Sequence, residues 1–145
     1  MQLTEHFADT ELGVAGCEER LIANASNLCA QILEPLRARY GPVLVHDGYR
    51  DPSHNARVGG KPASFHLFDC GRAAADASIG SPMRIAFDWM RLESGLPFDK
   101  VILETNAFGV PECIHVQIDS LNAPRREAYI GKTGAATNYT PMEVR

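Results

Sequence analysis

The chain has 145 residues, a formal net charge of −4 and no run of lysine or arginine, which argues against a nucleic-acid partner because phosphate binding needs a basic surface. Hydrophobic residues make up 45% and charged residues 22% of the chain, as in an ordinary globular domain, and no apolar run approaches the ~20 residues of a membrane span. The polar N-terminus has no apolar segment of a secretory signal, so we expect synthesis in the cytoplasm and no membrane partner.

The first half of the chain is predicted to hold one long helix and one short strand. Residues 1–16 are expected to form an irregular lead-in. Apolar residues at three- and four-residue steps predict a helix over 18–40, which Pro35 can kink. The run Val-Leu-Val-His at 43–46 predicts a strand, and residues 47–63 are expected to form loops and a glycine-rich turn.

The second half is predicted to supply most of the strands. Strands are expected over 73–79, 98–104 and 113–118, the last with Ile114, Val116 and Ile118 on one face and Cys113, His115 and Gln117 on the other. A helix is expected after Pro82 to about Glu93, capped by Ser81 and burying Ile85, Phe87 or Ala86, Trp89 and Leu92.

We therefore expect one α+β domain over 1–145. Its core should span about 5–122, followed by a loosely packed tail over 123–145 with one short strand near 127–130. The four cysteines are irregularly spaced and form no Cys-x-x-Cys pair, so we expect them to be reduced.

Two stretches carry the residues of a metal-dependent hydrolase. A catalytic zinc site takes three protein ligands and keeps one position for water. His66, Asp76 and His115 can supply these ligands, and Glu112 can serve as the base that takes the water proton. Because Glu112 and His115 are three residues apart, Glu112 can reach the same side only from a turn or a bulge.

The order of motifs resembles the LAS metallopeptidases (peptidase family M15), which are zinc D-Ala-D-Ala carboxypeptidases and phage L-alanyl-D-glutamate endolysins. The resemblance spans about residues 5–122. The matching positions are Gly48-Tyr49-Arg50, Asn55, Val58-Gly59-Gly60, Ser64, His66, Gly71 to Ala73, Asp76, Phe98-Asp99, Ile102 to Glu104, Glu112 and Ile114-His115-Val116.

The resemblance implies a hedgehog/DD-peptidase-like fold with a small antiparallel sheet and flanking helices. It implies that Zn2+ is bound by His66, Asp76 and His115, that Glu112 is the general base, and that Arg50 stabilises the oxyanion. Ser64 would hydrogen-bond the substrate or the ligand loop, and Tyr49 is a further candidate for substrate contact, although an aromatic residue there is more often core. The implied substrate is a peptidoglycan stem peptide.

The chain departs from the family pattern in three places. Ten positions separate His66 from Asp76, three more than in the family, so the extra residues must loop out and Asp69 becomes a rival ligand, with Cys70 a further donor nearby. Cys113 stands where tryptophan is usual, and Asp47 stands where serine is usual.

Each of these residues also has an ordinary structural explanation. His115 could be a core histidine, Asp76 a strand cap, Glu112 a solvated turn residue and Arg50 one half of a surface ion pair.

Three functions stay open at this stage. The first is a cell-wall peptidase, which would act at the wall after release from the cell or as part of a virion. The second is a virion structural or binding module that keeps the fold without the metal and contacts other virion proteins. The third is a non-haem iron oxygenase, which would need a His-x-Asp spacing and a jelly-roll strand pattern that the sequence lacks.

Overall fold

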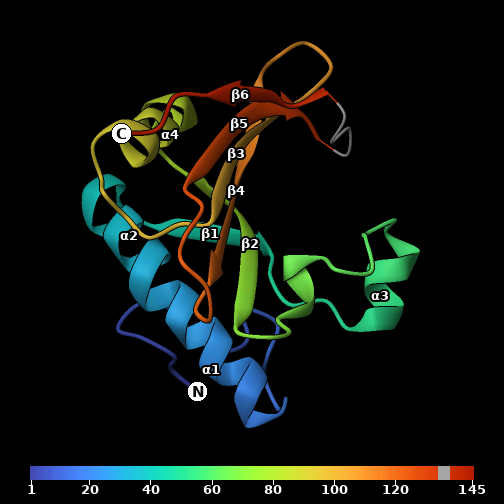
Figure 1. The fold of residues 1–145 in the computed structure, drawn as a ribbon. Coiled ribbons are helices and arrows are strands. Elements are labelled where there is room, and N and C mark those ends of the chain that lie inside the picture. The colour runs from blue at the N-terminus through green and yellow to red at the C-terminus, as the bar shows by residue number, and fades with distance from the viewer. Residues whose placement is uncertain (134–137) are drawn as a thin grey trace.

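A six-stranded, mostly antiparallel sheet forms the centre of the protein in the computed structural model, which describes residues 1–133 and 138–145 (Figure 1). The strand order is β1-β2-β4-β3-β5-β6, and among the described strands the pair β3 and β5 runs parallel. The strands are β1 (Val43–Asp47), β2 (Arg72–Ile79), β3 (Lys100–Thr105), β4 (Pro111–Asp119), β5 (Glu127–Lys132) and β6 (Thr140–Met142).

Helices flank this sheet, which confirms the predicted α+β class. They are α1 (Glu19–Leu28), the π-helical turn η1 (Cys29–Leu33), α2 (Glu34–Tyr40), α3 (Pro52–Arg57), the 3-10 turn η2 (Phe65–Leu67) and α4 (Met83–Leu92). Figure 1 shows α1, α2 and α4 on one side of the sheet and α3 on the other.

The long predicted helix is present as the continuous run of α1, η1 and α2, and Pro35 explains its wide middle turn. A proline inside a helix lacks a donor, and its ring crowds the carbonyl four residues earlier. Here that carbonyl belongs to Gln31, inside η1, where the amide of Glu34 bonds back five residues to the carbonyl of Cys29. The extra residue in this turn gives the proline ring room, so the helix continues.

The two faces of the sheet differ in chemistry because side chains alternate along each strand. One face is apolar and packs against α1, η1, α2 and α4 in one core. Its buried members on the three central strands are Ala73, Ala75 and Ala77, Val101 and Leu103, and Ile114, Val116 and Ile118. Each large side chain buried here stabilises the fold by about 1.5–3 kcal/mol. The opposite face carries the polar residues, and α3 and η2 lie beside it.

Residues 52–57 were predicted to be loop, but they form the short helix α3. The Asp51 carboxylate accepts a hydrogen bond of 2.7 Å from the backbone amide of His54, and Pro52 occupies the first helical position. An N-cap aspartate followed by proline is a helix-start pattern, and the single turn it starts is too short to show apolar periodicity.

The predicted helix after Pro82 is confirmed, but its cap and its buried face are shifted. Pro82 rather than Ser81 is the N-cap residue, and no side chain caps the helix. Ile85 is exposed, whereas Ala86, Phe87 and Met90 are buried.

The C-terminal segment over 123–145 was predicted to be loosely packed, with one short strand near 127–130. The expected strand is present as β5, which pairs parallel to β3 and buries Ala128. β6 then pairs with β5. The pairing of β5 with β3 joins distant parts of the sequence, so local patterns carry no sign of it. Residues 134–137 lie outside the described part of the chain.

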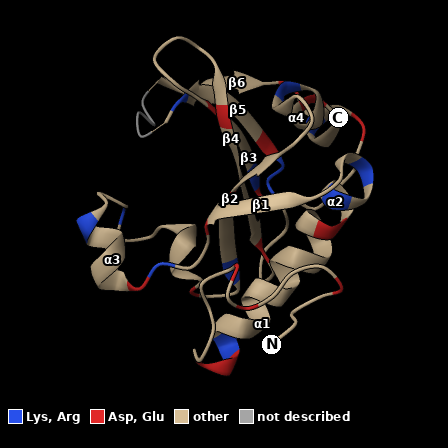
Figure 2. Cartoon of the chain, turned by 180° about the vertical axis from the view of Figure 1, so that it is seen from behind, with Lys and Arg blue, Asp and Glu red and all other residues tan. Residues whose placement is uncertain are grey.

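The structure also shows how charged residues and cysteines are distributed. Cationic and acidic segments are interspersed in the described part of the chain (Figure 2). None of its helices combines the length and apolarity needed to cross a membrane. All four cysteines are free thiols, as predicted.

Candidate metal centre

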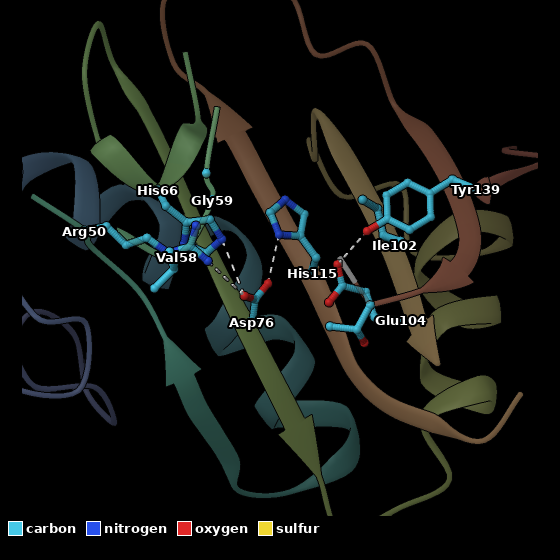
Figure 3. Close-up of a pocket in the computed structure, with 11 residues that line it drawn as sticks. Arg50, Val58, Gly59, His66, Asp76, Ile102, Glu104, His115 and Tyr139 are labelled. Carbon is cyan, nitrogen blue, oxygen red and sulfur yellow. Dashed lines mark hydrogen bonds and ion pairs between the residues drawn. The ribbon is translucent and has the colours of Figure 1, made fainter. Parts of the chain in front are cut away.

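Three predicted ligands meet on the polar face of the sheet (Figure 3). His66, Asp76 and His115 each direct one donor atom so that the three atoms lie within 4.8 Å of one another. Asp76 and His115 are direct partners across β2 and β4, and His66 comes from η2. Two of the three donors therefore stand on the central strands of the sheet, which holds them rigidly.

The orientation of His66 is set by its backbone and by one carbonyl. The Ser64 hydroxyl caps η2 by accepting from the His66 amide at 3.2 Å. The Arg50 amide donates to the His66 carbonyl at 2.7 Å. Nδ1 of His66 lies 2.8 Å from the Gly48 carbonyl, which can only accept, so Nδ1 carries a proton and Nε2 is left with its lone pair. That Nε2 is 3.5 Å from Asp76 Oδ2.

His115 presents its other ring nitrogen to the centre. Nδ1 lies 2.9 Å from Asp76 Oδ1, and Nε2 lies 2.7 Å from the side-chain oxygen of Gln117. The Nε2 proton is therefore donated to Gln117, and Nδ1 faces the carboxylate. Both imidazoles thus have an oxygen partner behind them and a nitrogen in front, as is usual for metal-binding histidines.

The contact between Asp76 and His115 determines how both side chains are protonated in the metal-free protein. Burial raises the pKa of Asp76, but hydrogen bonds from His115 and His66 outweigh burial and hold the pKa well below its usual range. Burial lowers the pKa of His115, but the hydrogen bond and charge of Asp76 outweigh it, so the pKa lies above its usual value. At pH values below the raised pKa of His115, the metal-free centre is an ion pair between a carboxylate and an imidazolium.

This ion pair predicts a two-sided pH dependence of stability without metal. The raised pKa of His115 makes its contribution complete below its unfolded value of about 6.5, and the contribution is lost as pH rises through the folded value. The depressed pKa of Asp76 makes its contribution complete above about 3.9, and it is lost as pH falls towards the folded value. We expect thermal unfolding of the chelator-treated protein to show a lower midpoint at pH 9 than at pH 6.

The matched variant for this measurement is Asp76→Asn, which removes the cause of the His115 shift. Its midpoint should change much less between pH 6 and pH 9 than that of the wild type. Equal slopes for the two proteins would contradict the assignment of the alkaline loss to this pair.

A cavity of about 340 Å³ opens beside the three donors. This is the size range of small-molecule and peptide sites. Its walls include Arg50, the Gly59-Gly60 turn, Ile102, Glu104 and Tyr139. The cavity thus combines a cation, a buried carboxylate and a short apolar wall around the candidate ligands.

Arg50 lies at the edge of this centre. Its Nε donates to Asp47 at 2.7 Å, and its Nη2 is 3.9 Å from Asp76 Oδ2. Asp47 thus holds the guanidinium against the centre, and a second contact of 3.4 Å to Asn55 supports it. Asp47, which stands where the resemblance has serine, therefore positions this cation.

Glu112, the predicted base, does not line the cavity. It sits at a β-bulge, because Cys113 pairs with Glu104 whereas Pro111 pairs with Thr105. The bulge was one of the two geometries that would allow it to face the metal. Its side chain is nevertheless exposed and accepts a hydrogen bond of 3.3 Å from Thr133.

Glu104 is the second carboxylate, beside Asp76, that lines the cavity, and no role was predicted for it from the sequence. It lies on β3 and is only 9% exposed. The Tyr139 hydroxyl donates to one oxygen at 2.9 Å, and the Cys113 thiol lies 3.4 Å from the other. Donor atoms of Asp76, Glu104 and Cys113 lie within 4.8 Å of one another, so Glu104 borders the metal centre. A signal was present, since the resemblance included a strand that ends in glutamate.

The model of the family described as Peptidase M15 matches residues 2–95, which is about two-thirds of the chain. The chain belongs to the peptidase M15 family. Two of the three candidate ligands, His66 and Asp76, lie inside the matched residues. No curated protein matches the chain. Family membership makes this a metallopeptidase-like protein, and M15 peptidases generally depend on zinc.

The donor set of this M15 chain fits zinc. Two imidazole nitrogens and one carboxylate oxygen form the mixed set of a catalytic zinc site, with room for water on the cavity side. The hydrogen bonds behind both histidines leave the correct nitrogen free in each ring.

The other predicted site residues lie apart from the centre. Tyr49 packs its ring on Phe68, with centroids 5.6 Å apart, which is the core alternative noted from the sequence. The rival ligand Asp69 is exposed and pairs with Arg20 at 2.9 Å. Cys70 is exposed as well.

The segment between η2 and β2, where the resemblance places three extra residues, forms a tight turn. Phe68, Cys70 and Gly71 all adopt positive φ there, with values of 55°, 55° and 73°. Phe68 is fully buried, and its carbonyl accepts from Asn24 of α1 at 2.8 Å. The insertion is thus absorbed in a turn against α1, and Asp76 stays in register opposite His115.

Proposed function

We propose that this M15 protein is a zinc-dependent peptidase that cleaves stem peptides of peptidoglycan. The observation that carries the proposal is the convergence of His66, Asp76 and His115 in a cavity that also holds Arg50 and Glu104. The peptidoglycan substrate rests on the resemblance of the motifs to cell-wall peptidases. The site of action would be the cell wall, reached by release from the cell or as part of a virion.

His66, Asp76 and His115 would hold the zinc, which lowers the pKa of a bound water and polarises the scissile carbonyl. Arg50 would bind the carbonyl oxygen and stabilise the negative charge that develops on it. Ser64 holds the η2 turn that presents His66.

Two carboxylates compete for the role of base. Glu104 faces the cavity and is buried beside Asp76, so we assign it the proton transfer from water to the leaving amine. Glu112 is the base expected from the motif, and exchanging each carboxylate for its amide in turn distinguishes the two.

The first test is metal content together with hydrolysis of peptidoglycan fragments. Protein purified without chelator should carry about one zinc per chain, and His66→Ala should lose it. The wild type should release a new amine from muropeptides with peptide stems. A folded wild type without metal or hydrolysis would contradict the peptidase and favour the virion binding module, which needs no metal.

A further inference from the structure

His115 stands at the end of a buried chain of hydrogen bonds that runs away from the cavity. Its Nε2 is 2.7 Å from the Gln117 oxygen, and the Gln117 amide nitrogen is 2.7 Å from Asp99 Oδ2. Arg125 then grips both oxygens of Asp99, at 2.9 and 2.7 Å. The exposed fractions of His115, Gln117 and Asp99 are only 9%, 5% and 2%.

The donors and acceptors in this series of hydrogen bonds can be arranged in only one consistent direction. Arg125 keeps the buried Asp99 ionised, because its hydrogen bonds outweigh the effect of burial and hold the pKa of Asp99 below its usual value. An ionised carboxylate only accepts, so the Gln117 NH2 group must point to Asp99. The Gln117 oxygen must then point to His115, and this oxygen only accepts as well. Nε2 of His115 must therefore carry the proton.

We infer that Asp99 and Gln117 are positioning residues that fix the Nε2 proton of His115 and so reserve its Nδ1 for the metal. The inference rests on the proposed zinc site and adds residues that the ligand motif does not contain. Partners behind a ligand histidine commonly change metal affinity by about 10- to 100-fold. The partner of His115 is the side-chain amide of Gln117, which can accept or donate according to its orientation. A second residue, Asp99, is therefore needed to fix that orientation.

Asp99→Asn tests whether Asp99 fixes the orientation of the Gln117 amide. Gln117 and Nη2 of Arg125 both donate to Oδ2 of Asp99, and Nε of Arg125 donates to Oδ1, so the single oxygen of an introduced amide cannot accept from all three donors. Asparagine therefore allows a second orientation that the carboxylate forbids, in which its oxygen accepts from Arg125 Nε and its NH2 group points to Gln117. Gln117 would then turn its oxygen to this new NH2 group and its own NH2 group to His115. In that orientation Nε2 would have to accept and the proton would move to Nδ1, so zinc binding should weaken in a chelator competition, by up to about 10- to 100-fold.

The rescue variant is Asp99→Asn combined with Gln117→Glu. The new carboxylate accepts from the introduced amide on one side and from His115 on the other, which restores the original direction with the same net charge. We expect the double variant to recover most of the lost zinc affinity, whereas Gln117→Leu, which has no acceptor, should not. A purely structural role of Asp99 would not produce recovery on adding a second buried change.

Asp119→Asn is the matched control. Asp119 lies on the same face of β4 and contacts Arg72 at 3.5 Å, but it makes no hydrogen bond to Gln117 or His115. Its zinc affinity should equal that of the wild type. Unfolding midpoints of the metal-free variants show whether each protein is folded.

A second readout needs no metal. Nitrogen-proton correlation spectra of the metal-free protein at pH 8 should place a proton on Nε2 of His115 in the wild type and in the double variant. In the second orientation of Asp99→Asn, at a pH above the raised pKa of His115, the neutral ring should carry its proton on Nδ1 instead. A wild type that binds no zinc but shows this pattern would refute the proposed function alone. Unchanged zinc affinity and proton position in both folded Asp99→Asn and folded Gln117→Leu would overturn the inference.

Discussion

Glu104→Gln is expected to lower kcat by about 10²- to 10⁴-fold, the usual contribution of a general base, while zinc content stays near one per chain. Glutamine keeps the size of the side chain and one oxygen to accept from Tyr139, so the cavity wall should survive. The amide cannot take a proton from water. Hydrolysis of a muropeptide, followed at saturating substrate, measures the effect on kcat separately from KM.

Glu112→Gln is the paired variant, and it makes the experiment decisive. Glu112 is exposed and bonded to Thr133 at 3.3 Å, so its amide should retain most of the activity. The opposite pattern, with full activity in Glu104→Gln and loss in Glu112→Gln, would return the base to the motif residue. It would also mean that the β4 bulge turns towards the cavity when substrate binds.

Alternation along a strand explains why His115 could be predicted to lie on the polar face, whereas the place of Glu104 beside the centre was missed. His115 was placed opposite Ile114 and Val116 by period-two patterning, and the structure has it on the polar face. Glu104 obeys the same rule with Ile102, but this places it near the metal only once β3 and β4 are paired in the observed register. Register is a tertiary property, so the motif spacing alone favoured Glu112.

Strand pairing at the edge of the sheet could not be predicted from local sequence for the same reason. β5 is parallel to β3 and therefore needs a long connection, and its partner cannot be identified from local composition. The helix of residues 18–40 was predictable because its apolar stripe is a local signal. The hydrogen bonds from His115 through Gln117 to Asp99 could not be predicted from the sequence either. They join separate segments through side chains whose contact depends on the register of β3 and β4.

The spacing between His66 and Asp76 shows that sequence distance alone can suggest a wrong metal ligand. Three extra residues made Asp69 a rival ligand on sequence distance. In the structure the turn at Phe68 to Gly71 takes up the added length outside the centre. What a metal site needs is the position of the donor on its element, and Asp76 has that position because it pairs with His115.

Asp76→Ala is therefore expected to weaken zinc binding by more than about 100-fold, beyond the usual effect of losing an outer partner, and to abolish hydrolysis. The carboxylate contacts both histidines, so its loss removes one ligand and frees the other two rings to turn. Zinc affinity is measured by chelator competition, and the unfolding midpoint of the metal-free variant shows that the fold persists.

Asp69→Ala is the matched control for this loss, because it removes an aspartate three residues from His66 that pairs with Arg20 on the surface. An exposed pair of this kind contributes about 0–1 kcal/mol, so stability, zinc affinity and hydrolysis should all stay near the wild-type values. Loss of zinc in Asp69→Ala with retention in Asp76→Ala would move the third ligand into the inserted turn. That result would require Asp69 to leave Arg20 and the turn to unfold from α1, since its carbonyl at Phe68 is held there by Asn24.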